Sequence, residues 1–159
     1  MRVLFVCTGN ICRSPSAEGV LRARLAALGL ERAVVVESCG THGYHEGDPP
    51  DSRAIRAGRR RGYDISGLRA RAWCADDAGA FDLVVAMEEH HARWVGQRLR
   101  PGARTRVVRL LDYAPHLPVR DVPDPWYGGD RDFEAMYDLI ETAIDGLVAE
   151  IAEALAVGR

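Results

Sequence analysis

A thiol and a guanidinium stand at the two ends of a short loop near the start of the chain. Residues 7–14, here called the phosphate loop, read Cys-Thr-Gly-Asn-Ile-Cys-Arg-Ser. Gly9 and Asn10 tolerate the positive φ angles that let successive backbone N–H groups converge on a tetrahedral oxyanion. Arg13 adds a planar fork that can grip two phosphate oxygens, and this positive environment favours the thiolate of Cys7. The Ser14 hydroxyl is in reach to donate a stabilising hydrogen bond, so the loop predicts attack by sulfur on phosphorus.

A second stretch with chemical potential lies late in the chain, at residues 121–129. Pro123 and Pro125 stiffen the backbone on either side of Asp124, so this carboxyl can be held in place as a general acid. Trp126 and Tyr127 follow at once and could wall an aromatic substrate. Taken alone, the same proline, aspartate and glycine residues also fit an ordinary turn.

The elements that position these two stretches alternate between strand and helix. Buried-type strands are predicted at 1–6, 33–37, 81–86 and 105–110, and helices at 17–28 (opened by Ser14 and Pro15), 51–61, 88–99 and from Asp130 onward. Asp51 or Ser52 is expected to cap the second helix. This order predicts a single α/β domain over residues 1–159, with a four-stranded parallel twisted sheet and helices on both faces. The phosphate loop follows the first strand, at the edge where such sheets bind ligands.

The composition restricts the classes of partner and cofactor. The net charge is −2 over 159 residues, so we expect neither a nucleic acid nor a membrane surface as a partner. All 21 basic residues are arginine, which excludes a phosphate-loop lysine and Schiff-base chemistry. The apolar runs are too short for a signal peptide or a membrane span, so a cytoplasmic location is expected. None of the four cysteines forms a CxxC pair, so a structural zinc site is not expected.

The run from Cys7 to Pro15, together with Asp124-Pro125-Trp126-Tyr127, resembles the low-molecular-weight protein tyrosine phosphatases. The likeness extends to residues 38–54, where Tyr44 falls at the position of a substrate-lining aromatic. It implies a metal-independent, cofactor-free acid phosphatase that releases inorganic phosphate, which would also inhibit it, from phosphotyrosine in proteins or peptides. In this comparison the nucleophile is Cys7, the transition-state ligand is Arg13 and the general acid, later the base, is Asp124. The phosphate-binding positions are Thr8, Gly9, Asn10, Ile11, Cys12 and Ser14, and the substrate-lining ones are Tyr44, Trp126 and Tyr127.

Several positions depart from the family pattern. Leu68 stands where a histidine often bonds the loop asparagine, so another group is expected to hold Asn10. Met-Glu-Glu-His-His at 87–91 replaces the more usual Met-Asp, and Cys39 stands where a smaller residue is common. By the same resemblance, Cys12 could form a reversible disulfide with Cys7, and its plainer interpretation is a small buried packing residue.

Two rival activities remain open. A phosphoarginine phosphatase is the near neighbour, but that branch commonly has threonine where this chain has Ile11. An arsenate reductase would need further cysteines to relay a disulfide, and Cys39 and Cys74 are not closely spaced.

Other polar clusters have plainer interpretations. The adjacent His90 and His91 point about 100° apart on a helix, so they are predicted to be solvated and unable to share one metal ion. Loop residues His42 and His45 are assigned no role. The basic segment formed by Arg53, Arg56, Arg59, Arg60 and Arg61 is interpreted as a solvated helix face, and Cys74, Asp76 and Asp77 as a helix cap.

Overall fold

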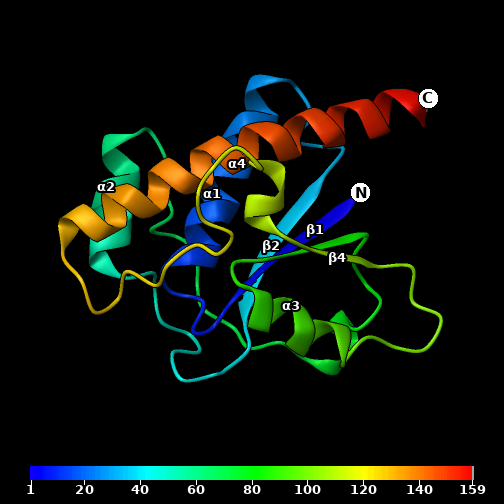
Figure 1. The fold of residues 1–159 in the computed structure, drawn as a ribbon, viewed down its shortest axis with the longest axis horizontal. Helices are drawn as coiled ribbons and strands as arrows, with labels where there is room; N and C mark the ends of the chain where they lie inside the picture. Colours follow the sequence, from blue (N-terminus) through cyan, green and yellow to red (C-terminus); the bar gives the residue numbers. More distant parts are fainter. Residues whose placement is uncertain (159) are drawn as a thin grey trace.

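The computed structural model describes residues 1–158, in which four parallel strands form one sheet. The strands are β1 (Arg2–Cys7), β2 (Val35–Gly40), β3 (Leu83–Ala86) and β4 (Arg106–Arg109), in the order β2-β1-β3-β4. The chain leaves β1 for β2 on one side and later returns to β3 on the other (Figure 1). The phosphate loop follows the first strand, as predicted, and the structure adds that this strand is an interior one, at the point where the strand order reverses.

Helices cover both faces of the sheet, as expected from its buried strands. Helices α1 (Arg13–Ala27), α2 (Ser52–Arg60) and α4 (Asp130–Val157) lie on one side, and α3 (Glu89–Gly96) lies on the other (Figure 1). In β1, Val3, Phe5 and Cys7 belong to the larger core beneath α1 and α4, while Leu4 and Val6 face the smaller core on the side of α3. This period-2 alternation of apolar residues on both faces is what a buried parallel strand requires.

Two short 3₁₀ helices complete the described elements. They are η1 (Ala75–Asp77) and η2 (Leu110–Tyr113). The predicted cap at Cys74 is confirmed, because the backbone N–H of Cys74 donates to the Asp77 carboxylate at 2.8 Å. Asp51 is confirmed as the N-cap of α2, accepting from the N–H of Arg53 at 2.8 Å. No helix of residues 1–158 contains a stretch long and apolar enough to cross a bilayer.

Several predicted boundaries of strands and helices differ from those in the structure, and contacts with other segments explain the differences. Strand β2 was expected to end at residue 37 but runs to Gly40, because it pairs with β1 residue for residue up to Cys7. A Cβ atom at Gly40 would lie 2.6 Å from the carbonyl oxygen of Thr8, so glycine is what lets β2 reach the phosphate loop. Helix α3 begins one residue later than expected and ends at Gly96, which leaves Glu88 as an extended N-cap.

Candidate active site

The phosphate loop joins the end of β1 directly to the first turn of α1. Cys7 is the last residue of β1 and is 3% exposed, with its sulfur 2.9 Å from the Ser14 hydroxyl oxygen. The expectation that Ser14 and Pro15 open the helix is wrong, since α1 begins at Arg13 with Cys12 as its N-cap. The Ser14 hydroxyl is therefore free to face the sulfur instead of capping the helix.

The backbone of the phosphate loop turns its carbonyl groups outward. The carbonyls of Cys7, Thr8, Ile11 and Cys12 accept hydrogen bonds from the backbone N–H groups of residues 41, 42, 51 and 16, at 2.8–3.3 Å. Within residues 1–158, none of the N–H groups of residues 8–13 donates to a protein acceptor. Unpaired N–H groups next to a helix N-terminus can bind an anion.

Asn10 locks the conformation of the loop. It is the one non-glycine residue in the described chain with positive φ, at 59°, and it is 3% exposed. Its side-chain amide donates to the hydroxyls of Ser14 (2.8 Å) and Ser38 (2.9 Å) and accepts from the backbone N–H of Arg71 (3.0 Å). Ser38 and Arg71 thus hold Asn10 where the family histidine is replaced by Leu68, which packs against the core. Since the Ser14 oxygen accepts from Asn10, its own proton can point at the Cys7 sulfur.

Arg13 is an almost fully buried cation, 2% exposed, with three partners. It donates to the carbonyl of Val122 (2.9 Å) and to the Glu88 carboxylate (2.5 Å), and its other terminal nitrogen lies 3.6 Å from the Asp124 carboxylate. Burial opposes the charge of Arg13, but Cys7, Glu88 and Asp124 outweigh it and raise the pKa of the guanidinium. Burial likewise works against ionisation of Glu88, yet the hydrogen bond and charge of Arg13 lower the pKa of this carboxyl. The arrangement fixes a permanent positive charge beside the loop.

Asp124 reaches the site from the segment before α4. Its side chain is 43% exposed, and one carboxylate oxygen accepts from the N–H of Trp126 at 3.1 Å while the other faces Arg13. Arg53 anchors this segment by donating to the carbonyls of Trp126 (3.0 Å) and Gly128 (2.8 Å) while bonded to the Asp51 carboxylate. Sequence reasoning missed this role of Arg53.

The interpretation of the basic segment as a solvated face is confirmed for Arg56, Arg59 and Arg60, which are exposed, and wrong for Arg53 and Arg61, which are half-buried in ion pairs. Arg60 and Arg61 pair with Glu134, and Arg56 pairs with Asp130, so helix α2 is bound to α4 through ion pairs. These acidic partners lie more than seventy residues away in the sequence, which is why local patterning could not reveal them.

One cavity of about 360 Å³ collects most of the predicted site residues. Its lining consists of Cys7, Thr8, Gly9, Ile11, Cys12, Arg13, Tyr44, His45, Asp124, Trp126 and Tyr127. Asn10 and Ser14 belong to the same loop, but their side chains are buried and position its atoms rather than line the cavity. His45, to which the sequence assigns no role, also lines the cavity, next to Gly9 and with its ring centroid 6.3 Å from that of Trp126. Cys12 lines the cavity as a free thiol whose pKa is raised chiefly by burial.

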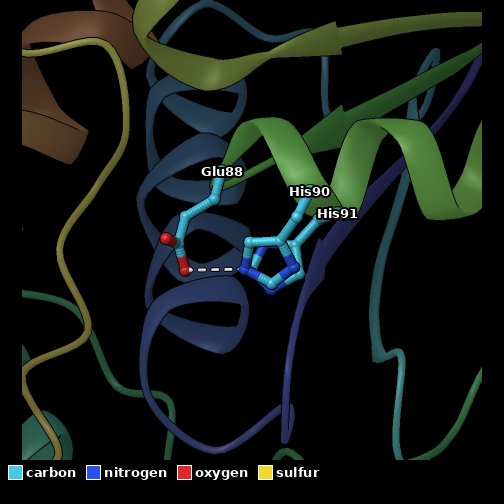
Figure 2. Close-up of side chains that lie close together, drawn as sticks. All are labelled: Glu88, His90 and His91. Atoms are coloured by element: carbon cyan, nitrogen blue, oxygen red, sulfur yellow. Dashed lines mark hydrogen bonds and ion pairs between the residues drawn. The ribbon is translucent and has the colours of Figure 1, made fainter.

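The prediction of solvated side chains is confirmed for His90, which is exposed, and wrong for His91. His91 is completely buried, and its Nε2 lies 2.9 Å from the Thr8 hydroxyl, so it supports the phosphate loop from the side of α3. Burial, aided by the charge of Arg13, lowers the pKa of His91 to about 3, so the ring is neutral. The two imidazole centroids are only 4.0 Å apart, and both rings gather with Glu88 beside the first turn of α3 (Figure 2). The Glu-Glu-His-His run at 88–91, which departs from the family pattern, was the one feature of the sequence that could have pointed to this cluster.

Comparisons with known proteins agree with this geometry. A family model described as low molecular weight phosphotyrosine protein phosphatase matches residues 2–157. A low molecular weight protein-tyrosine-phosphatase from Streptomyces coelicolor is 42% identical over 156 residues, covering 96% of this chain and 94% of the relative. The crystal structure of a protein tyrosine phosphatase from Entamoeba histolytica, with Hepes in its active site, superposes with a TM-score of 0.91 at 33% identity, covering 97% and 98% of the two chains. The crystal structure of an arginine phosphatase from Drosophila superposes with a TM-score of 0.89 at 26% identity, covering 95% of this chain and 98% of the Drosophila chain. The chain belongs to the low molecular weight phosphotyrosine protein phosphatase family.

Proposed function

We propose that this protein hydrolyses phosphotyrosine monoesters in proteins or peptides through a phosphocysteine intermediate. The observation that carries the proposal is the convergence of Cys7, Arg13 and Asp124 on one cavity, from the end of β1, the start of α1 and the segment before α4. A buried sulfur, a fixed cation and a half-exposed carboxyl are the three groups that phosphoryl transfer by a protein nucleophile requires.

In the first step the Cys7 thiolate attacks phosphorus, and the bond between phosphorus and the phenolic oxygen breaks. The unpaired N–H groups of the phosphate loop and the guanidinium of Arg13 bind the three non-bridging oxygens as charge develops on them. Asp124, in its protonated form, gives its proton to the departing tyrosine oxygen. Glu88 and the Val122 carbonyl hold Arg13 in place, so little reorganisation is needed during the reaction.

In the second step water attacks phosphorus of the phosphocysteine, and the bond between sulfur and phosphorus breaks. The Asp124 carboxylate accepts the proton of the water, which returns this group to its starting form. Inorganic phosphate leaves, and the Ser14 hydroxyl stabilises the regenerated Cys7 thiolate at 2.9 Å. The protein groups supply both proton transfers, and neither step calls for a metal ion or an organic cofactor.

The walls of the cavity favour an aromatic phosphate ester. Tyr44, Trp126 and Tyr127 present aromatic surface around the phosphate loop, and Ile11 adds an aliphatic contact. A phenyl ring gains from the aromatic and the aliphatic contacts, whereas the charged guanidinium of phosphoarginine can stack on the aromatic rings but gains little from Ile11. Phosphotyrosine is therefore the proposed substrate ahead of phosphoarginine.

Cys12 gives the site a proposed redox response. It lines the same cavity as Cys7 and is held as a thiol by burial, so an oxidised Cys7 would meet a neighbouring thiol able to close a reversible disulfide. A reducing compartment such as the cytoplasm would keep both thiols free for the proposed reaction.

The test is steady-state hydrolysis of free phosphotyrosine and p-nitrophenyl phosphate at mildly acidic pH, with EDTA present. Cys7→Ser should abolish both activities. Asp124→Asn should slow phosphotyrosine hydrolysis by about 10²–10³-fold, within the range of general acid catalysis. The loss should be smaller for p-nitrophenyl phosphate, whose leaving group needs less protonation.

Two results would contradict the proposal. Phosphatase activity that survives in Cys7→Ser would remove the nucleophile from the scheme, and equal losses for both esters in Asp124→Asn would remove the general acid. Phosphoarginine is assayed in parallel, and a kcat/KM equal to or above that for phosphotyrosine would overturn the substrate preference.

A further inference from the structure

Three side chains with metal-binding atoms meet where α3 begins, next to the phosphate loop. Glu88 is the N-cap, with extended backbone (φ −138°, ψ 162°), and His90 and His91 are the second and third residues of the helix. The extended cap lets the Glu88 side chain lie alongside the first turn, so Glu88 and the two imidazoles point into one space (Figure 2). One ligand atom from each residue lies within 4.8 Å of those from the other two.

His91, a member of this cluster, has a ring nitrogen without a hydrogen-bond partner. The residue is fully buried, and its Nδ1 has no hydrogen-bond partner, while Nε2 is 2.9 Å from the Thr8 hydroxyl. Buried polar atoms nearly always have a partner, so this atom calls for an explanation. When Nε2–H donates to Thr8, Nδ1 carries a lone pair. A histidine that binds a metal through one nitrogen typically donates the other N–H to a nearby oxygen in this way.

The spacing fits a small tetrahedral ion. Two ligand atoms bound to one zinc ion at its usual bond lengths are about 3.3 Å apart at a tetrahedral angle. His90 Nε2 and a Glu88 carboxylate oxygen are 3.3 Å apart. The His90 side chain is 63% exposed, so it can turn to close the longer separations in the cluster.

We propose that Glu88, His90 and His91 form a binding site for Zn²⁺, with water completing the coordination. Two imidazoles and one carboxylate are a ligand set that zinc accepts in proteins with an open fourth position. None of the three residues lines the reaction cavity, and Glu88 connects the site to it by holding Arg13.

Occupancy of the site would act on Arg13. The Glu88 oxygen that faces His90 is also the one that accepts from Arg13 at 2.5 Å. A zinc ion on this carboxylate competes with the guanidinium and places positive charge beside it. We therefore expect bound zinc to disturb Arg13 and inhibit the enzyme. This consequence rests on the proposed function, whereas zinc binding itself does not.

The binding test uses the full chain with Cys7→Ser and Cys74→Ser, which removes the nucleophilic thiol of the cavity and the exposed thiol. Zn²⁺ is titrated calorimetrically, and one equivalent should bind. Adding His90→Ala should weaken binding at least about tenfold, as expected for the loss of a ligand. His116→Ala is the matched control, an exposed histidine outside the cluster, and should leave the affinity unchanged. Absence of binding, or equal affinity in His90→Ala, would overturn the site.

The regulatory consequence is tested in the enzyme with Cys7 intact and Cys74→Ser. Zinc should inhibit hydrolysis of p-nitrophenyl phosphate, and EDTA should restore it. His90→Ala should leave metal-free kcat/KM nearly unchanged and raise the inhibitory zinc concentration by about the same factor as its loss of affinity. Inhibition that is identical in both proteins would overturn this route and assign the effect to Cys7. An enzyme inactive even without zinc would instead contradict the proposed function and leave the binding result standing.

Discussion

The hydrogen bonds around Asn10 lead to a quantitative prediction for the substitution Asn10→Gly. Glycine adopts the φ of 59° without steric cost, so this change removes the side-chain contacts and leaves the backbone unstrained. Three hydrogen bonds are lost, to Ser14, Ser38 and the N–H of Arg71. In the folded state the variant therefore loses the hydrogen-bond network and little else.

The expected loss of stability follows from the number of bonds. At about 1 kcal/mol for each buried hydrogen bond, Asn10→Gly should lower the free energy of unfolding by about 3 kcal/mol. The added freedom of glycine in the unfolded chain contributes about 0.5–1 kcal/mol more. Ser38→Ala removes the bond to Asn10 and the bond to Glu18, and should cost about 2 kcal/mol. Because one bond is shared, the double variant should lose about 1 kcal/mol less than the sum of the single variants.

Urea denaturation of the four proteins measures this coupling, and phosphatase kinetics measure its effect on the site. The Ser14 hydroxyl loses the donor that orients it toward Cys7, so Asn10→Gly should reduce kcat/KM by about 10–100-fold. If the two substitutions are additive within about 0.3 kcal/mol, the network does not act as described. Ser38 would then not compensate for the histidine that Leu68 replaces.

Three further predictions address the remaining contacts. The pKa of Glu88 is lowered in the folded state, because the hydrogen bond and charge of Arg13 outweigh burial. The ionised carboxylate therefore stabilises the fold at pH values above its unfolded-state pKa, and this stabilisation is lost as the pH falls through its folded-state pKa. Glu88→Gln should thus be less stable than wild type at neutral pH and should approach it in acid, as followed by thermal melts between pH 2 and 7. Arg53→Lys should lower kcat for phosphotyrosine by about tenfold with a normal melting temperature, since lysine cannot bridge two carbonyls in a fixed fork. Gly58→Ala should destabilise the fold by about 1–3 kcal/mol in urea, despite the better helix propensity of alanine, because its methyl group would overlap the Tyr137 hydroxyl.

The sequence was a good guide wherever function depended on neighbouring residues. The phosphate loop is contiguous, so its strand, its glycine and its helix could be read together, and the prolines around Asp124 marked a second constrained segment. The four strands were found because parallel strands buried on both faces are short runs of apolar residues. The end of β2 was missed because Ser38, Cys39 and Gly40 have no strand preference and are placed there by pairing with β1.

Contacts between distant segments could not be predicted from the sequence. Nothing local indicates that Arg53 reaches the carbonyls of Trp126 and Gly128, or that α2 pairs with acidic residues of α4. His91 was expected in solvent because polar residues on a predicted helix are mostly exposed, and nothing local indicates that the phosphate loop lies against it. In the structure the ring lies between α3 and the phosphate loop, and its burial there lowers the pKa and keeps the ring neutral.

The place of β1 in the sheet also affects how the site tolerates motion. β1 is hydrogen-bonded on both sides, to β2 and β3, and its residues 3–7 are buried. Amide hydrogens of such a strand exchange with solvent only when most of the domain opens. The cavity walls around Tyr44 and Tyr127, in contrast, are exposed loop segments that can open at little cost. The phosphate group would meet a fixed centre, while the walls remain free to adjust to peptides of different shape.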